Sequence, residues 1–499
     1  MNGFIRNVVV VHVAGLALAF SWIHGGTRAE LLLPVIPWLA AFTLELLFIF
    51  PQIKSTETLS EARSRVCHAL VRDPLFYAAI ALTVLLVIPL FNVAGAPVFD
   101  EALKQWHNPT PPVAWLPSCV KANEHAVLLL WFPPVLIAAL AAQHGLLKRG
   151  KRLLLEILCW NGAALALFGF VQLLTGAKSI FWGEEPFSYF FSTFGYPNFA
   201  GAFFTLFFAL STGLWFGRAS VHVIGHQVGS DIHPGDLSFL EQHYLLVAVL
   251  LNFGAAITSL SRAAILLCGV AFLVLSAYIV FGVWQKAGTG GRVKVLAVIA
   301  ITLFLIGLFF SVFAPEALKS EVAAITPTTV ADRVSGRAYY HARVAKEIFR
   351  DHRVFGVGGW GYPHYVTQYL KPEELSGIQI QGGANVHNDS LQFLAEQGWV
   401  GFGLLLVCVA LLVVPLFWQV LRFCRSAAGA RTPPKPAWLY RLPAPVIGVF
   451  VGTSATVCHS MGDLPFRDPA IMIVWVLAFV CVSGFLPAER GNQSAVPPR

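Results

Sequence analysis

Long apolar runs separated by short polar stretches dominate the chain. They fall at about 7–23, 31–50, 74–94, 126–143, 153–175, 198–217, 243–260, 263–285, 293–314, 399–421, 443–460 and 470–487. A helix needs about 20 apolar residues to cross roughly 30 Å of hydrocarbon. The runs also lack the apolar–polar alternation of strands in a membrane barrel. We therefore predict an all-α polytopic membrane protein with about twelve transmembrane helices.

Two details of this pattern affect the span assignment. The turn Ser259-Leu-Ser-Arg262 divides one long apolar stretch into two spans, and it is the least marked of the boundaries. The first run has no small-residue cleavage site after its apolar part, so we expect a retained helix rather than a signal peptide.

Composition agrees with the apolar pattern and excludes a soluble enzyme. Of the 499 residues, 57% are hydrophobic and only 12% are charged, whereas soluble proteins carry about 25% charged residues. The mean hydropathy of +0.68 points the same way. A disordered or collagen-like chain is excluded by the same numbers.

The placement of Lys and Arg predicts the orientation in the membrane. With the N-terminus inside the cell, the tails and the even-numbered loops hold most of the basic residues that lie outside the segment 315–398. Cytoplasmic loops are enriched in Lys and Arg, so both termini are predicted to be cytoplasmic. The net charge of +8 then mainly reflects topology and does not indicate nucleic-acid binding.

One connecting segment, 315–398, is much longer than the others and is predicted to lie outside the cytoplasm. Loops of this length are uncommon unless they are functional or disordered, and its many aromatic residues argue against disorder. Residues 333–350 carry an apolar stripe at helical spacing, and a second helix is expected from about His387 toward Gly398. We therefore divide the chain into helices one to nine (1–314), a folded helical loop (315–398), and helices ten to twelve with a short cytoplasmic tail (399–499).

Three residues outside the cytoplasm are the leading candidates for chemistry. Arg262 lies at the outer membrane boundary and Arg337 opens the helix of the long loop, with Arg333 one turn earlier. Each Arg presents a fork of donors suited to phosphate oxygens, although a lipid contact or a solvated face explains either one about as well. His387 can accept a proton near neutral pH, but a loop histidine is more often simply solvated.

Further polar residues in the outer loops are possible supporting groups. Asn388 and Asp389 follow His387, and Tyr196 and Asn198 lie in the turn that opens the sixth span, where interfacial aromatics are an equally good explanation. Asp463 shares the short last outer loop with Arg467, and the two are expected to form a local ion pair.

Metal and nucleotide sites are not indicated. No Cys/His spacing fits a zinc site, no Asp-x-Asp occurs, and the cysteines provide no exported pair for a disulfide. The run Gly356-Val-Gly-Gly-Trp-Gly361 imitates a dinucleotide fingerprint, but no strand is expected before it. We predict neither a metal nor a cofactor.

Several short motifs together resemble the O-antigen ligase superfamily. They are Ser-x-Ser-Arg at 259–262, Gly336-Arg337, Phe355-Gly-Val-Gly358, and His387-Asn388 followed by Glu396-x-Gly398-x-x-Gly401. The motifs cover roughly residues 190–470. Each motif is short and degenerate, but their order along the chain and their location on one side of the membrane are together more specific for the family. One departure is Tyr339-Tyr340-His341, where relatives often carry a tryptophan.

The resemblance implies a helical fold similar to C-type glycosyltransferases, located in the bacterial inner membrane. It implies that Arg262 and Arg337 hold the diphosphate of an undecaprenyl-diphosphate-linked O-antigen, and that His387 is the catalytic base. The acceptor would be a sugar hydroxyl of lipid A–core in the periplasm, which completes lipopolysaccharide. The transfer would be inverting and independent of metal.

Other functions remain open at this level. An O-antigen polymerase would use another lipid-linked repeat unit as the acceptor, and an O-linked protein oligosaccharyltransferase would use a protein. A transporter or flippase of lipid-linked glycans would have no chemistry at all. Away from the ends of the apolar runs, charged residues, which mark many transport pathways, are limited to Glu45 and Glu156, and no internal repeat is evident.

Overall fold

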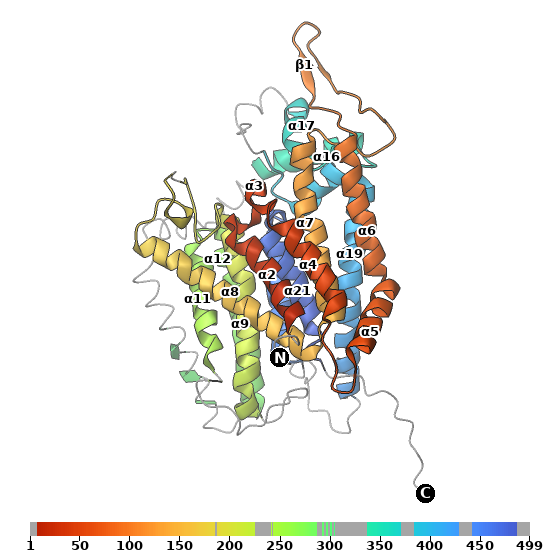
Figure 1. Ribbon diagram of the computed structural model, residues 1–499. Helices are drawn as coiled ribbons and strands as arrows, with labels where there is room; N and C mark the ends of the chain where they lie inside the picture. The colour runs from red at the N-terminus through yellow and green to blue at the C-terminus, as the bar shows by residue number, and fades with distance from the viewer. Residues whose placement is uncertain are drawn as a thin grey trace.

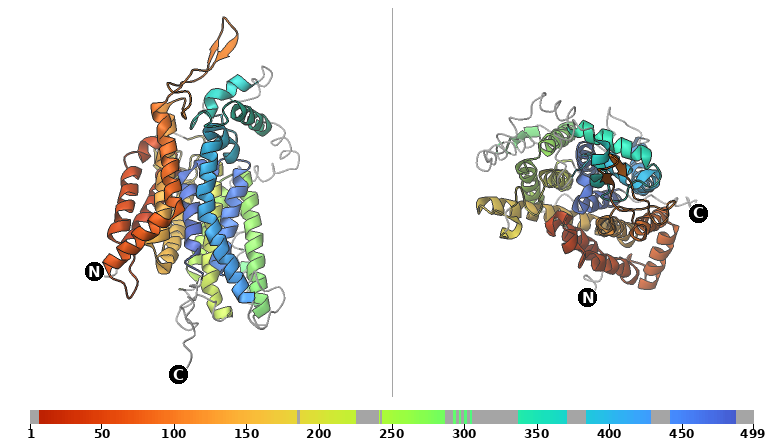
Figure 2. Two further views of the ribbon diagram at one scale, coloured as in Figure 1. Left: turned by 90° about the vertical axis from the view of Figure 1, so that its right-hand side faces the viewer. Right: turned by 90° about the horizontal axis from the view of Figure 1, so that it is seen from above.

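A computed structural model gives the arrangement of the chain. It describes residues 7–184, 187–224, 241, 243–286, a few residues between 292 and 304, 337–370, 384–428 and 442–486. Apolar helices form a bundle, and two shorter helices and a hairpin lie at one end of it (Figures 1 and 2).

Six described helices are long and apolar enough to cross a membrane. They are Pro74–Phe91 (α6 with a 3-10 turn), Ala122–Gly145 (α7 with a π turn), Lys148–Leu174 (α8), Pro197–Ala219 within α9 (Pro197–Ile224), Arg262–Gly282 within α12 (Arg262–Lys286), and Asp389–Arg425 within α19 (Asp389–Ala428). These results confirm a helical, multi-pass membrane protein.

Five further apolar helices coincide with predicted runs but are shorter. They are α2 (Val8–Trp22), α4 (Ile36–Ile49), α11 (Leu245–Thr258), α20 (Ala444–Ser460) and α21 (Pro469–Val482). At 1.5 Å rise per residue, a helix of 14 residues reaches only about 21 Å, less than the hydrocarbon thickness. The ninth predicted span, 293–314, lies mostly outside the described residues, so the total of twelve stays a prediction.

The centre of the bundle is built from α9, α20 and α21. Every residue of α21 is buried, as expected for a helix that is apolar on all sides. Asp468 caps it by accepting hydrogen bonds from the backbone N–H groups of Ala470 (2.8 Å) and Ile471 (3.3 Å). α9 crosses α20 at Gly213 and Gly448, where a Cβ on Gly213 would lie 2.9 Å from the Gly448 Cα, so small residues allow the close approach.

The group at the end of the bundle, which we call the cap, contains α16 (Arg337–Asp351), α17 (Tyr362–Tyr369) and residues 384–397. It has its own apolar cluster, which includes Val344, Ile348, Tyr362 and Val366. The helix predicted over 333–350 is therefore present from Arg337, while 333–336 lie outside the described residues. The predicted division at 314/315 also falls outside them.

The second predicted helix of the long loop continues directly into the membrane span. α19 begins at Asp389, and its one non-helical residue is Gly398 (φ 60°, ψ −167°). The loop 353–358 packs against this break, with backbone hydrogen bonds from Gly358 N–H to the Glu396 carbonyl (2.8 Å) and from Trp399 N–H to the Arg353 carbonyl (2.8 Å). The break thus fixes the cap on the bundle.

Two elements were not anticipated from the sequence. A two-stranded antiparallel hairpin, β1 (Val98–Asp100) and β2 (Gln105–His107), projects beyond the cap (Figure 1), so the chain is not entirely helical. An amphipathic helix, α5 (Leu59–Arg72), lies near the opposite end and begins with a capping box of Thr58 and Glu61.

Candidate active site

The turn that opens α9 directs two polar side chains toward the cap end of the bundle. Pro197 occupies the first turn of the helix, where its fixed φ suits helix initiation. The Tyr196 hydroxyl donates to Asp463 Oδ2 (3.0 Å), and the Asn198 amide donates to the same carboxylate oxygen. Both predicted supporting residues of this turn therefore meet Asp463, which lies 267 and 265 positions further along the chain.

Asp463 is the buried centre of this group. Besides Tyr196 and Asn198, the backbone N–H of Leu464 donates to its Oδ1 (2.8 Å). Burial raises the pKa of this carboxyl, but the imidazoles of His387 and His459 and the Leu464 N–H outweigh burial, so the pKa is held below its usual range. The carboxylate is thus charged at neutral pH.

His387 lies beside this carboxylate. Its Nδ1 is 3.7 Å from Asp463 Oδ1, within ion-pair range, and 31% of its side chain is exposed. Its backbone has a φ of +54°, a left-handed conformation that costs non-glycine residues of order 1–3 kcal/mol and occurs most often at functional sites. An oriented, partly open imidazole of this kind can accept a proton at Nε2 while Nδ1 faces the carboxylate.

The residues after His387 hold the loop in place. Asn388 Oδ1 accepts from the Leu391 N–H (3.0 Å), which caps α19, and its amide donates to the Met461 carbonyl (3.0 Å). Asp389 accepts from the Phe466 N–H (3.0 Å). Both candidates therefore connect α19 to the turn that carries Asp463, which is a positioning role.

A second histidine packs against the first from the cap. The ring centroids of His341 and His387 are 6.4 Å apart, and His341 Nδ1 is 2.8 Å from the Tyr362 hydroxyl. Burial raises the pKa of Tyr362 well above its usual range, so its hydroxyl keeps its proton. Through His341, α16 contributes an imidazole to the site.

The arginine candidates are only partly described. Arg337 begins α16, one helical turn before His341, which brings the start of this helix to the site; its side chain lies outside the described part. Arg333 lies outside the described residues altogether. Arg262 begins α12 next to Ser261, whose hydroxyl donates to Asn198 Oδ1 (2.6 Å), and it is not among the described residues that line the cavity below.

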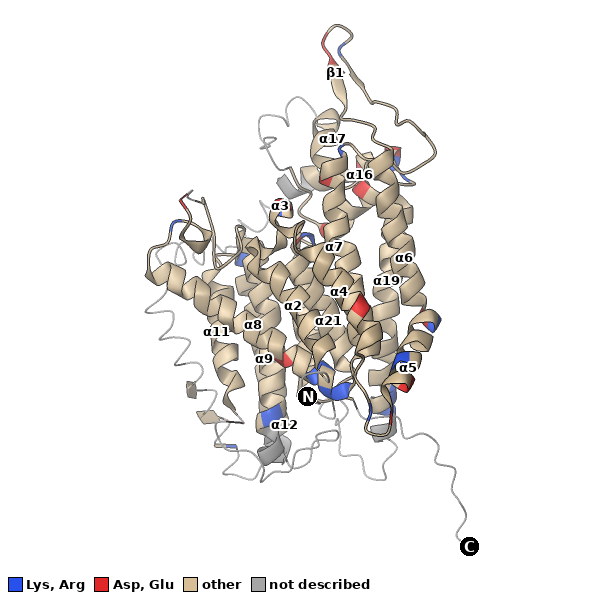
Figure 3. Ribbon diagram, in the orientation of Figure 1, with Lys and Arg blue, Asp and Glu red and all other residues tan. Residues whose placement is uncertain are grey.

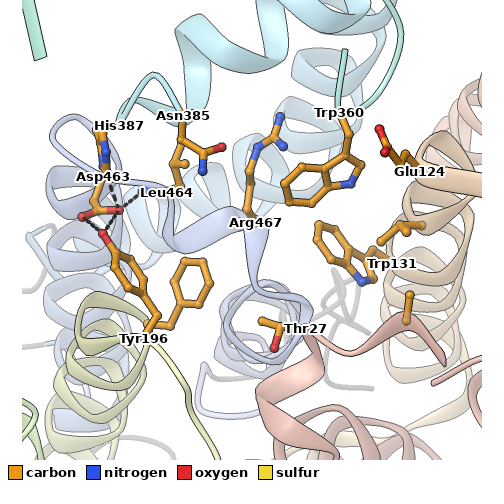
Figure 4. A pocket seen from close by; sticks show the side chains of 13 residues that line it. Thr27, Glu124, Trp131, Tyr196, Trp360, Asn385, His387, Asp463, Leu464 and Arg467 are labelled. Atoms are coloured by element: carbon orange, nitrogen blue, oxygen red, sulfur yellow. Dashed lines mark hydrogen bonds and ion pairs between the residues drawn. The ribbon is translucent and has the colours of Figure 1, made fainter. Parts of the chain in front are cut away.

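The predicted ion pair between Asp463 and Arg467 is wrong. Arg467 pairs instead with Glu396, whose side chain is only 1% exposed, and its guanidinium lies 4.4 Å from the centroid of the Trp360 ring. A short 3-10 turn, Pro465–Arg467, turns Arg467 away from Asp463 (Figure 4). Asp463 is therefore available to His387, Tyr196 and Asn198.

A cavity of about 630 Å³ opens beside His387. It is lined by Thr27, Ala29, Glu124, Val127, Trp131, Tyr196, Phe199, Trp360, Asn385, His387, Asp463, Leu464 and Arg467 (Figure 4). Ligand pockets commonly have volumes of about 300–1,000 Å³, mostly apolar walls and a few convergent polar groups. A reacting group in this cavity would contact both an aromatic wall and the His387–Asp463 pair.

Several of these lining residues were missed from the sequence. Trp360 lies in a glycine-rich turn, and Glu124 and Trp131 lie in the first half of a span, where charged residues near the end and aromatic residues are common. Their common feature, a shared cavity, depends on contacts between distant segments. No local pattern in the sequence indicates that these residues line one cavity.

The described parts of the chain contain no group of three or more His, Cys, Asp or Glu side chains placed to hold a metal ion. Independence of metal stays a prediction.

Comparison with known proteins matches one segment of the chain, which contains His387, to a protein family. Residues 247–423, from α11 through the cap and most of α19, match the family described as O-antigen ligase. No curated protein matches the chain. The matched segment includes Ser261, Arg262, Arg337 and His387, and this part of the chain is similar to the O-antigen ligase family.

Proposed function

We propose that this protein transfers an O-antigen glycan from undecaprenyl diphosphate to a sugar hydroxyl of lipid A–core, at the periplasmic face of the bacterial inner membrane. The observation that carries the proposal is the pairing of His387 with the buried Asp463 carboxylate at the wall of a cavity. His387 lies in the segment that matches the O-antigen ligase family.

The proposed reaction is a direct displacement with inversion. The acceptor oxygen forms a bond to the anomeric carbon while the bond from that carbon to the diphosphate oxygen breaks. His387 Nε2 takes the hydroxyl proton, and Asp463 stabilises the imidazolium that results; general-base catalysis of this kind contributes about 10²–10⁴-fold. Arg262 and Arg337 would bind the departing diphosphate, where preorganised cations lower the barrier most.

A diphosphate is already a good leaving group, so this chemistry needs no strong acid. It needs cations where negative charge increases and a base near the acceptor. The partly exposed imidazole of His387 supports its role as the base, because a fully buried ring would not reach a hydroxyl in the cavity. Arg337, at the start of α16, lies one helical turn before His341, whose ring packs against His387. This position supports a role for Arg337 as the cation near the departing diphosphate.

Reconstitution tests the proposal. The purified protein in nanodiscs would receive an undecaprenyl-diphosphate-linked glycan, with lipid A–core added or withheld and with excess EDTA in one arm. We expect a glycan ladder on lipid A–core that EDTA does not diminish. His387→Ala should lower the rate by about 10²-fold or more, whereas His107→Ala, in the exposed hairpin, should leave it unchanged.

The other outcomes contradict the proposal in distinct ways. Chain extension without lipid A–core would identify a polymerase. Transfer lost in EDTA and restored by magnesium would contradict the metal-independent reaction. Absence of transfer in both wild type and His387→Ala, with donor translocation retained, would identify a transporter.

A further inference from the structure

The cavity beside His387 has two chemically different ends. His387, Asp463 and Tyr196 lie at one end, and Trp131, Trp360 and Glu124 lie at the other, with Asn385 between them (Figure 4). The proposed reaction uses only the first end. The second end must therefore be explained by something other than proton transfer.

Two tryptophans form the wall at the second end. The ring centroids of Trp131 and Trp360 are 5.9 Å apart at an interplanar angle of 75°, an edge-to-face arrangement that fixes both rings. Trp131 is buried, whereas Trp360 is partly exposed. The cavity wall thus includes a partly exposed indole ring that Trp131 and the Arg467 guanidinium hold in place.

The backbone holds Trp360 in an unusual conformation. Its φ is +58°, a value that is rare for a bulky residue, and His387 across the cavity has a φ of +54°. The Trp360 N–H donates to Glu396 Oε2 (3.2 Å), which fixes the main chain there. Strained backbone retained at both ends of one cavity indicates that both side chains are positioned for a ligand.

The polar groups around this wall favour an uncharged ligand. Glu396 neutralises Arg467, so the guanidinium over Trp360 does not create a net positive site. The Glu124 carboxylate, which accepts from Lys121 Nζ (2.8 Å) and lies 2.7 Å from His364 Nε2, lines the same end. Lys121 neutralises Glu124 in the same way, so this end of the described cavity wall carries no net positive charge that would attract a phosphate.

A sugar fits the aromatic and acidic lining of this end. The C–H groups of a pyranose pack against an aromatic side chain such as the partly exposed Trp360, and its hydroxyls donate to a carboxylate such as Glu124.

We propose that the Trp131–Trp360 end of the cavity is the acceptor subsite, and that it binds an uncharged pyranose ring of the acceptor glycan. This inference rests on the proposed function. A sugar ring packed against the exposed part of Trp360, between Glu124 and Asn385, directs the reacting hydroxyl of the acceptor toward His387. Trp360 is then a residue that binds acceptor and has no part in holding the donor.

Variants at Trp360 test the subsite. In the reconstituted reaction, Trp360→Ala should raise the KM for lipid A–core by about tenfold or more, Trp360→Phe should raise it less because a ring remains, and the KM for donor should stay unchanged. The matched control is Trp115→Ala, a tryptophan that is 77% exposed in the loop after the hairpin. Unaltered donor KM shows that a variant is folded.

A binding measurement separates this proposal from the proposed function. Saturation-transfer NMR would use the core oligosaccharide, released from lipid A and either dephosphorylated or not. We expect transfer to pyranose ring protons that Trp360→Ala abolishes, with the dephosphorylated form binding at least as well. Binding by wild type and loss in Trp360→Ala, without any glycan transfer, would support the subsite and contradict the proposed function.

Three results would overturn the subsite. They are an unchanged acceptor KM in Trp360→Ala while transfer still depends on His387, absence of oligosaccharide binding by the wild type, and binding only of the phosphorylated form. The first of these would leave the proposed function standing, and the last would replace the uncharged ligand with an anionic one.

Discussion

The Asp463 carboxylate accepts hydrogen bonds from, and lies within ion-pair range of, side chains whose segments are far apart in the chain. Tyr196 and Asn198 come from the start of α9, His387 precedes α19, and Leu464 belongs to its own turn. Hydrogen bonds from neutral donors favour the ionised form of a carboxylate. The negative charge then stabilises a proton on the neighbouring imidazole. The aspartate is accordingly a positioning residue for His387.

Substitution of Asp463 by Asn should slow the proposed transfer without removing His387. Asn keeps the shape but loses the charge that stabilises the imidazolium. We expect kcat to fall by about tenfold to a hundredfold, less than the whole contribution of a general base, with KM for donor little changed. Steady-state kinetics of the reconstituted protein would measure this, with Asp100→Asn in the hairpin as the control. An unchanged kcat would exclude the pairing from the mechanism.

The same substitution has a pH-dependent effect on stability. Because the pKa of Asp463 is lowered in the folded protein, its ionised form stabilises the fold above the unfolded-state pKa of about 3.9. This stabilisation is lost as the pH falls through the lower folded-state pKa. The difference in melting temperature between wild type and Asp463→Asn should therefore be constant from pH 7 down to about pH 4 and shrink as the pH falls further. A difference that does not shrink at low pH would contradict the assigned ionisation.

At the scale of the elements, the sequence was informative wherever a pattern is local. The apolar runs predicted the helices, and Ser259-Leu-Ser-Arg262 marked the break between α11 and α12. The hairpin was missed because its strands are three residues long, too short for alternation to show. The pairing of Arg467 was assigned wrongly because Asp463 is near in sequence, whereas Glu396 is near only in the folded chain.

Gly398 illustrates how one residue determines the junction of two elements. Its φ of +60° and ψ of −167° belong to a region that is essentially restricted to glycine, and a Cβ there would lie 2.3 Å from the Val354 carbonyl oxygen. The motif Glu396-x-Gly398 thus has a structural explanation. The glycine allows α19 to break where the cap loop packs against it.

Gly398→Ala should destabilise the cap junction by about 1–3 kcal/mol or more, because strain and overlap add. The matched control is Gly403→Ala in the same helix, where a Cβ would meet no atom within 4 Å and should be neutral or slightly stabilising. Thermal unfolding can be followed by the reaction of buried free cysteines, such as Cys408, with a fluorogenic thiol reagent. Equal melting temperatures for the two variants would contradict the strained geometry.

At the scale of the whole molecule, charge is distributed unevenly between the two ends of the bundle. Lys and Arg side chains gather at the end opposite the cap (Figure 3). Several of them bind main-chain carbonyls there, as Arg65 does at Gln52 (2.7 Å) and Arg152 at Gly484 (2.7 Å). Cytoplasmic ends of membrane proteins are enriched in these residues, so this distribution supports a periplasmic cap.

Labelling of single cysteines tests that orientation. Ala102→Cys, in the exposed hairpin, and Arg149→Cys, exposed near the start of α8, lie at opposite ends of the bundle. In a background with Cys67, Cys424 and Cys458 changed to Ser, intact spheroplasts would be treated with a membrane-impermeant maleimide. We expect Ala102→Cys to react before lysis and Arg149→Cys only after it. The reverse pattern would place His387 and its cavity in the cytoplasm, where lipid A–core ligation could not follow the proposed scheme.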